Sequence, residues 1–228
     1  MVYIYISENQ SPIGNQTTNQ NQVSGEHMSV NSKLKRTIDI MGAIAGLTIT
    51  GLMFVPVAIA IKLNSKGSVL YSQTRCGYKG RKFRIWKFRS MVSNADDLKS
   101  QVKNEIKGAF FKNENDPRIT KVGKFLRKTS LDEFPQFWNV LMGDMSLVGT
   151  RPPTTDEVSQ YNQKHWLRLD VKPGLTGEWQ VNGRSQVLDF EQVVDLDIQY
   201  QKKWSIVYDL KLICKTIQVI FDKNNGAC

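Results

Sequence analysis

The feature that most constrains this fold is one apolar stretch near the N-terminus. Residues 37–61 read TIDIMGAIAGLTITGLMFVPVAIAI, and Asp39 is the only charged residue among them. A run of about 25 residues is long enough to cross the hydrocarbon core of a bilayer as a helix. Because so apolar a run is more typical of a membrane-embedded helix than of a soluble core helix, we expect this segment to contact lipid.

Two details bear on whether this helix spans the bilayer. Pro56 lies inside it, and a proline removes a helical hydrogen bond and bends or breaks the helix. Both flanks are basic, with these residues before and after the stretch: Lys33, Lys35, Arg36, Lys62 and Lys66. A spanning helix usually has its excess of Lys and Arg on the cytoplasmic side only. These features leave two alternatives open, a single span and a re-entrant helix that enters and leaves on one face.

The charge and the cysteines narrow the classes of partner. The formal net charge is +10, which beside a membrane segment suggests anionic lipid headgroups and phosphate-bearing substrates. We expect no nucleic-acid partner, because the sequence has no zinc-finger spacing, RNA-binding aromatic motif or arginine-rich tract. The scattered Cys76, Cys214 and Cys228 give no disulfide framework and fit a reducing compartment.

The chain divides into segments of different composition. Residues 1–32 are rich in Asn, Gln and Ser, and they are predicted to form a disordered polar tail. We expect a membrane helix with its basic flanks over 33–66, a catalytic domain on the cytosolic face over 67–222, and a short tail over 223–228. The fold class predicted for the whole is α/β, dominated by helices with a small β component.

The hydrophobic periodicity and the turn residues predict the elements of the catalytic domain. The predicted strands are 69–72, 83–88, 145–148 and 178–181. A turn is predicted over 173–177. The predicted helices are 92–107, 120–128, 136–142, 156–169, 189–203 and 206–222. The last helix has a broad apolar face, which suits either a core helix or a helix lying in the membrane interface.

The adjacent carboxylates Asp132 and Glu133 are the candidate catalytic residues. Ser130 precedes Glu133 by three positions, which is the pattern of a capping box at a helix start. Pro135 favours a helix that begins nearby, so in either register both carboxylates lie at the positive end of a helix dipole. An ionised carboxylate can attack phosphorus, and its neighbour can bind Mg²⁺. Taken alone, the pair favours capping over catalysis.

Arginines close to turns strengthen the catalytic interpretation. Arg127 lies about one turn before the acidic pair, Arg151 lies in a proline-braced loop, and Arg184 lies in a turn that contains glycine. A guanidinium group binds phosphate through paired hydrogen bonds. Each arginine alone is an ordinary surface residue, but together with the acidic pair and the membrane segment they suggest a phosphate-handling site that faces lipid.

At these residues the chain resembles the bacterial sugar transferase family, the monotopic phosphoglycosyl transferases. The matching blocks follow one another over nearly all of residues 33–222, and together they are highly specific. They include Lys35-Arg36, Arg75-x-Gly77-x-x-Gly80, Lys87-Phe88-Arg89-Ser90-Met91, Leu126-Arg127, Ser130-Leu131-Asp132-Glu133, Pro135-Gln136-x-Trp138-Asn139, Arg151-Pro152 and Trp179-Gln180-Val181-Asn182-Gly183-Arg184.

The resemblance implies a reaction and roles for the site residues. Family members transfer a sugar-1-phosphate from a UDP-sugar to polyprenyl (undecaprenyl) phosphate and release UMP, which starts exopolysaccharide, capsule or other glycan assembly. It implies that Asp132 forms a covalent phosphosugar intermediate, that Glu133 helps to hold Mg²⁺, and that Arg127 binds the lipid phosphate. By the same resemblance, Arg151 and Arg184 are candidate contacts to the donor phosphate or nucleotide.

The resemblance also implies a location at the cytoplasmic face of the bacterial cell membrane. It favours a re-entrant membrane helix broken at Pro56, together with interfacial amphipathic helices. Two residues depart from the family pattern. Val55 stands where a serine often precedes the proline, which puts the stability of the break in question. Thr150 stands where a proline usually precedes Arg151, which puts the rigidity of that loop in question.

Two other classes of function stay open on the sequence. A membrane glycosyltransferase would transfer only the sugar and would release UDP without a covalent enzyme intermediate. A non-catalytic scaffold of a polysaccharide assembly complex would tolerate the loss of the acidic pair. The sequence does not specify the sugar or the oligomeric state, for which a homodimer is one alternative.

Overall fold

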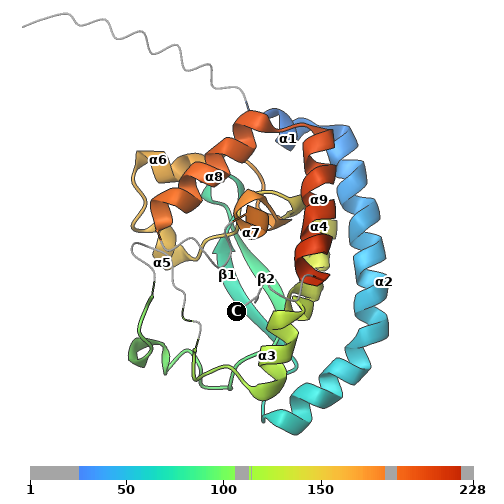
Figure 1. The fold of residues 1–228 in the computed structure, drawn as a ribbon, viewed down its shortest axis with the longest axis vertical. Helices are drawn as coiled ribbons and strands as arrows, with labels where there is room; N and C mark the ends of the chain where they lie inside the picture. The colour runs from blue at the N-terminus through green and yellow to red at the C-terminus, as the bar shows by residue number, and fades with distance from the viewer. Residues whose placement is uncertain (1–25, 106–112, 114, 183–188, 222–228) are drawn as a thin grey trace, which may run out of the picture.

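The protein is described by a computed structural model that covers residues 26–105, 113, 115–182 and 189–221 (Figure 1). The helices are α1 (Met28–Asn31), α2 (Lys33–Asn64), α3 (Lys121–Lys128), α4 (Phe137–Met142), α5 (Thr155–Val158), α6 (Gln163–Trp166), α7 (Glu178–Asn182), α8 (Phe190–Lys203) and α9 (Ile206–Phe221). The strands are β1 (Leu70–Cys76), β2 (Lys82–Phe88), β3 (Ser146–Val148) and β4 (Gly174–Thr176). Short 3-10 helices are η1 (Tyr78–Gly80), η2 (Lys99–Gln101), η3 (Leu131–Gln136) and η4 (Leu167–Asp170).

The apolar stretch forms helix α2, which continues through Pro56. Its C-terminal part curves toward α3 (Figure 1). The break in helical structure expected at Pro56 is therefore absent. By length and composition alone, α2 is also the one helix of the described residues that could cross a membrane.

Helix α2 contacts the rest of the protein along its whole length. Near its start, the carboxylate of Asp39 accepts a hydrogen bond of 2.9 Å from the Ser146 hydroxyl. In its middle, Gly46 leaves room for the ring of Phe137, which a Cβ at this position would overlap. Near its end, Ile61 is buried in a hydrophobic cluster beside β2 and α3. Both ends of the helix are therefore attached to the same body.

The main sheet is an antiparallel hairpin of β1 and β2, with Leu70 opposite Phe88 and Cys76 opposite Lys82. The prediction of a strand over 83–88 is confirmed, while β1 extends further than the predicted strand 69–72. The side-chain amide of Asn139 completes the free edge of β2, since it donates to the Arg84 carbonyl (2.7 Å) and accepts from a backbone N–H of the strand. The amide thereby pairs edge groups in the middle of β2 that would otherwise be open to another strand.

A second, smaller sheet pairs β3 in parallel with β4. Strand β3 confirms the prediction for 145–148, but two predictions beside β4 are wrong. Residues 174–176 form β4 where a turn was predicted, because Gly149 and Gly174 lack the Cβ atoms that would overlap the facing backbone. The predicted strand 178–181 is helix α7, in which the adjacent Glu178 and Trp179 are both buried. Their burial does not alternate along the chain as a strand on one core face would require.

Two predicted helices differ from the observed structure because of local sequence preferences. The described part of the predicted helix 92–107, up to residue 105, contains turns and the short η2 but no α-helix. Asn94, Asp96 and Asp97 lie in these turns, and such residues favour turns over helix interiors. The predicted helix 156–169 is divided into α5, α6 and η4. Thr154 and Asn162 each cap a new helix start in a capping box, with Glu157 and His165 as the partners. The predicted helices 120–128, 136–142, 189–203 and 206–222 are confirmed by α3, α4, α8 and α9.

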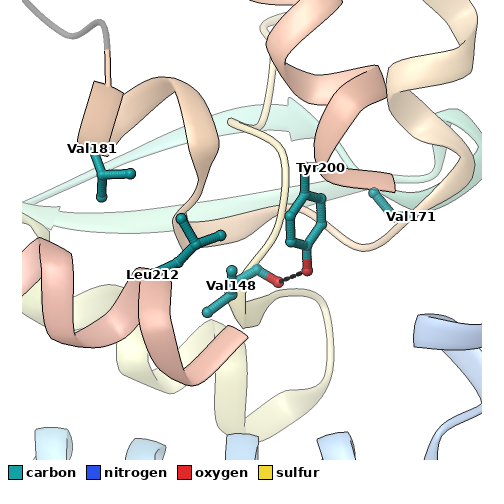
Figure 2. Close-up of a cluster of buried hydrophobic side chains, with 5 residues drawn as sticks. All are labelled: Val148, Val171, Val181, Tyr200 and Leu212. Carbon is teal, nitrogen blue, oxygen red and sulfur yellow. Dashed lines mark hydrogen bonds between the residues drawn. The ribbon is translucent and has the colours of Figure 1, made fainter. Parts of the chain in front are cut away.

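The end of the predicted polar tail packs on the domain. Helix α1 lies within residues 1–32, and His27 Nε2 lies 3.0 Å from the carbonyl oxygen of Gln201 at the end of α8. Residues 1–25 and 223–228 lie outside the described residues. The C-terminal helices then cover β3, where Val148, Val171, Val181, Tyr200 and Leu212 form a core cluster (Figure 2). In this cluster Tyr200 donates a hydrogen bond of 3.1 Å to the Val148 carbonyl (Figure 2).

Candidate active site

A cleft of about 630 Å³ lies against the hairpin and contains most of the predicted site. Its lining comes from β1, β2, η3, α7, the segment after β2, the end of α3 and the loop before α5. The cleft brings together Asp132, Glu133, Arg127 and Arg151. Arg184 lies outside the described residues, and Pro56 lies in α2 and does not line the cleft.

The acidic pair lies in the first turn of η3. Asp132 lines the cleft but is largely buried, with 6% of its surface exposed. Ser130 has left-handed backbone dihedrals (φ 55°) and makes no capping bond with its side chain, so the capping box predicted for Ser130 and Glu133 is wrong. The bend at Ser130 turns the chain from α3 into η3. A capping box from Ser130 therefore does not explain why the two carboxylates lie here.

Lys87 on β2 forms an ion pair with Glu133, with 2.8 Å between Nζ and Oε1. Both side chains are partly exposed, at 26% and 28%, so solvent and ligands can reach them. Lys87 begins the Lys87-Phe88-Arg89-Ser90-Met91 block, but the sequence alone did not predict a role for it. Strand periodicity was the available signal, because Ile85, Lys87 and Arg89 alternate along the chain and all line the cleft.

Arg127 is oriented from the last turn of α3. Its Nε donates a hydrogen bond of 2.9 Å to the hydroxyl of Ser90, which follows β2. Helix α3 approaches this segment closely because Gly123 has no Cβ, which would overlap the Ser90 carbonyl. The hydroxyl of Thr120 caps the start of the same helix by accepting from Gly123 N. The guanidinium is thus positioned at the cleft by its own hydrogen bond to Ser90 and by the close packing of α3 on the same residue.

Arg151 lies in a loop that is fastened at both ends. Before it, the buried Thr150 hydroxyl donates to the Arg168 carbonyl (3.0 Å). After it, the Pro152 carbonyl accepts a hydrogen bond of 3.0 Å from Arg75 Nη1. The rigidity that the sequence left in question at Thr150 is therefore supplied by a hydrogen bond from its side chain.

The Arg168 carbonyl that holds Thr150 belongs to a residue that is itself immobilised. Arg168 Nε forms a buried ion pair with Asp197 Oδ2 at 2.6 Å, and its Nη1 donates to Tyr161. Only 2% and 1% of the two charged side chains are exposed. The support of the Arg151 loop therefore extends from η4 into α8.

Arg75 is a site residue that sequence reasoning missed. Burial, together with the nearby positive charge of Arg151, lowers the pKa of Arg75 to about 10. Two guanidinium groups that repel one another in a cleft are suited to an anion, which would relieve the repulsion. The arginine of the Arg75-x-Gly77-x-x-Gly80 block, three residues after the predicted strand 69–72, was the signal available in the sequence.

Asp116 and Arg118 form a buried ion pair in the wall of the cleft, with 2.7 Å between Arg118 Nη2 and Asp116 Oδ2. Burial alone would raise the pKa of Asp116, but hydrogen bonds from Arg118 and its positive charge lower that pKa below its ordinary value of 3.8. Arg118 also donates to the Ala95 carbonyl. The pair fixes the turn that follows the 92–105 segment.

The donor set of the cleft fits Mg²⁺ when a substrate shares the coordination. Within the described ranges, no cluster of three His, Cys, Asp or Glu residues could hold a metal alone. Asp132 and Glu133 supply two adjacent carboxylates on the cleft wall. Mg²⁺ commonly binds to one or two carboxylates and completes its octahedron with water and substrate phosphates.

Comparisons with a family model and with individual proteins agree on one family. The family model described as bacterial sugar transferase matches residues 30–223. The galactosyl transferase CpsE of Streptococcus agalactiae serotype III is 52% identical over 188 residues, which cover 82% of this chain and 42% of CpsE. The UDP-glucose:undecaprenyl-phosphate glucose-1-phosphate transferase of Escherichia coli is 42% identical over 196 residues, which cover 82% of this chain and 40% of that protein.

A shorter relative matches over nearly its whole length. The exopolysaccharide production protein ExoY of Rhizobium meliloti is 36% identical over 203 residues, which cover 86% of this chain and 89% of ExoY. The chain thus spans about two fifths of the length of the first two relatives and most of the length of ExoY.

Proposed function

The chain belongs to the bacterial sugar transferase family, and from this premise we propose that it transfers a sugar-1-phosphate from a UDP-sugar to polyprenyl phosphate. The names of two relatives support this class of reaction, since one is called a UDP-glucose:undecaprenyl-phosphate glucose-1-phosphate transferase and another an undecaprenyl-phosphate galactose phosphotransferase. The two names differ in the sugar, so the proposal specifies a UDP-sugar and leaves its sugar open. The reaction would start the lipid-linked assembly of an exopolysaccharide or capsule.

The proposed reaction has two displacements at phosphorus through Asp132. In the first, a carboxylate oxygen of Asp132 attacks the sugar-bearing phosphorus of the UDP-sugar, and the bond to the bridging oxygen breaks so that UMP leaves. In the second, a phosphate oxygen of polyprenyl phosphate attacks the same phosphorus. The bond to Asp132 then breaks, which regenerates the carboxylate and yields a polyprenyl diphosphate sugar. Covalent catalysis of this kind divides one difficult transfer into two easier ones.

The cations of the cleft stabilise the charge in both displacements. Arg75 and Arg151 both line the cleft, close enough for their charges to interact, so they can bind the donor diphosphate. Arg127 lies at the end of α3, where it can bind the acceptor phosphate. Glu133, with Asp132 beside it, is the residue that we expect to hold Mg²⁺, which when bound would neutralise the diphosphate. Preorganised charges of this kind usually supply the largest part of catalysis.

The placement of Asp132 carries this proposal. It is buried at 6% exposure, lines a cleft rich in guanidinium groups and follows a residue that does not form the expected helix cap. We would measure the intact mass of the protein after incubation with Mg²⁺ and a UDP-sugar, without acceptor. We expect an added hexose phosphate on the wild type and on Asp195→Asn, whose side chain is 64% exposed. Asp132→Asn should fold and carry no adduct; an adduct on this variant would contradict the mechanism.

The exposed surface of α2 supports a membrane location. Large apolar residues on its outer face are strongly exposed, among them Met41 (67%), Leu52 (77%) and Leu63 (83%). Helix α9 also exposes apolar residues, such as Val207 (61%) and Ile217 (52%). Because monomeric soluble proteins rarely expose large apolar patches, exposed apolar residues along both helices support contact with lipid.

The contacts of α2 favour entry from one face of the bilayer. Since both ends of the helix pack on the same domain, a full crossing would have to draw part of that domain through the bilayer. We therefore propose that α2 is re-entrant and that α9 lies in the interface. Because the proposed donor is a UDP-sugar, which is made in the cytoplasm, we propose that the cleft faces the cytoplasm at the bacterial cell membrane.

A further inference from the structure

Buried polar atoms without a hydrogen-bond partner gather in the candidate active site. Among the described residues, such atoms include Arg75 Nε, Arg89 Nε, Gln136 Nε2 and Gln180 Oε1, and all four residues line the cleft. Folded proteins pair nearly all of their buried polar atoms, so each exception needs an explanation. Several exceptions in one cleft point to a polar ligand that completes their hydrogen bonds.

Gln136 is the most informative member of this group. Only 3% of its surface is exposed, and its Nε2 has no partner within the described parts of the chain. It is the last residue of η3, four positions after Asp132. In a 3-10 helix residues three positions apart lie on the same face, so Gln136 shares a face with Glu133, and its side chain lines the same cleft as Asp132 and Glu133.

Asn139 shows that a buried amide in this region can be fully paired. It lies less than one helical turn further along the chain, in α4, and only 2% of its surface is exposed. Its Nδ2 donates to the Arg84 carbonyl at 2.7 Å, and its Oδ1 accepts from Trp86 N at 3.2 Å. The unpaired amide of Gln136 therefore contrasts with a nearby buried amide whose nitrogen and oxygen both have partners.

We propose that Gln136 is a further substrate-contacting residue, whose Nε2 donates a hydrogen bond to an oxygen of the phosphoryl group that Asp132 attacks. This inference rests on the proposed function. A neutral amide suits such a position, because it can hold a phosphoryl oxygen without forming the ion pair with Asp132 that an arginine would form. A donor aimed at that oxygen stabilises the charge that develops there during displacement.

The test compares stability with activity, because removing the unpaired amide should not harm the fold but should harm the reaction. Gln136→Met has a similar volume and no polar group, so it removes an unpaired donor from the interior. Replacing such a group with an apolar one can leave stability unchanged or improve it. We expect the melting temperature of Gln136→Met to equal or exceed that of the wild type, while kcat/KM for the UDP-sugar falls at least about 10-fold.

Asn139→Leu is the matched control, because it removes a buried amide whose hydrogen bonds are all made within the protein. We expect it to lower the melting temperature clearly, since it leaves the Arg84 carbonyl and Trp86 N unpaired. A Gln136→Met protein that melts as low as Asn139→Leu would overturn the inference, because the amide would then be structural. So would a Gln136→Met protein with the kcat/KM of the wild type.

The same assay separates this inference from the function on which it rests. Release of UMP by the wild type, together with unchanged kcat/KM in Gln136→Met, would contradict only the role of Gln136. A wild type that releases no UMP with any donor of a panel that includes UDP-glucose and UDP-galactose would contradict the proposed function and, with it, this inference. Gln136→Glu gives a further check, because it keeps the shape but replaces the donor by a carboxylate, and we expect a larger loss than in Gln136→Met.

Discussion

Lys35 Nζ lies 2.5 Å from Asp209 Oδ2, and this ion pair ties the start of helix α2 to helix α9. Both side chains are buried, at 7% and 6% exposure. Lys35 also donates to the Val148 carbonyl, and Asp209 accepts hydrogen bonds from Tyr200 and Trp204. The two helices with the most exposed apolar surface are therefore held to one another and to the core by a single polar cluster.

Removing one charge of this cluster should destabilise the protein strongly. Asp209→Leu leaves the Lys35 ammonium buried without its counterion, which costs about 3–5 kcal/mol in comparable pairs. The double variant Lys35→Met/Asp209→Leu should recover much of this loss, because neither charge is left unpaired. The measurement is denaturant unfolding in a fixed detergent. Asp195→Asn, which breaks an exposed pair with Lys164, should cost less than about 1 kcal/mol, and an equal cost in Asp209→Leu would refute the prediction.

The Asp116–Arg118 pair predicts how stability depends on acid. Because the folded-state pKa of Asp116 is lowered, its contribution is fully present above the unfolded pKa of about 4 and is lost as the pH falls through the lower folded pKa. Asp116→Asn should therefore be less stable than the wild type at pH 7. The difference should shrink below about pH 4 when unfolding is measured from pH 7 to pH 2.5. A difference that stays constant across this range would show that the carboxylate charge is not responsible.

Thr150 should act as a positioning residue for Arg151. Thr150→Val keeps the shape of the side chain but removes the hydroxyl that donates to the Arg168 carbonyl. A buried hydrogen bond of this kind is worth about 1–1.5 kcal/mol, so we expect the KM for the UDP-sugar to rise about 5- to 10-fold. Thr150→Ser keeps the donor and should stay within about 2-fold of the wild type. Equal effects of the Ser and Val variants would mean that the hydroxyl does not position the loop.

The surface of α3 should contribute to membrane binding. Phe125 is 60% exposed and lies among the exposed Lys121, Lys124 and Lys128. A lysine near an anionic surface contributes about 1 kcal/mol, so replacing all three with Gln should weaken binding to vesicles containing phosphatidylglycerol by up to about 100-fold. Binding to phosphatidylcholine vesicles should not change.

A control set separates this surface from a general effect of charge. The exposed Lys79, Lys82 and Lys164 carry the same total charge on η1, β2 and α6. Replacing these three with Gln should have little effect on vesicle binding in the same flotation assay. If the two triple variants lose binding equally, the net charge of the protein and not the α3 surface governs the interaction.

Most helices were predictable because their ends have strong local signals. Thr120 caps α3, Gly143 ends α4 in a left-handed conformation, and Asp189 caps α8. These side-chain and backbone preferences act within a few residues and can be recognised in any context. Strand β2 was predictable from its composition, since it combines aromatic and β-branched residues with basic ones.

Other elements depend on partners that are distant in the chain. Strand β4 has three residues and exists because its backbone pairs with β3, which ends 26 residues earlier. Ser130 has left-handed backbone dihedrals, which glycine and asparagine adopt more readily than serine. The sequence therefore contains no sign of this turn and suggested a capping box instead. Both features come from tertiary packing, which overrides local propensity.

The candidate site was predictable in its acidic pair and in two of its arginines. Lys87, Arg75 and Gln136 were not assigned roles, because a strand or helix residue gains such a role only from the side of the cleft on which it lies. Arg184 was predicted and lies outside the described residues. The hydrogen-bond inventory of the folded chain, and not residue type, singles out Gln136.

The identity of the nucleotide released is the most direct test of the proposed reaction. The protein, held in a nanodisc, would be incubated with Mg²⁺, polyprenyl phosphate and a panel of UDP-sugars that includes UDP-glucose and UDP-galactose. We predict that UMP is released with at least one donor, that a lipid-linked sugar diphosphate appears in equal amount, and that Asp132→Asn releases none. Release of UDP would contradict the Asp132 mechanism and indicate an ordinary glycosyltransferase, and release of neither nucleotide across the panel would favour a scaffold.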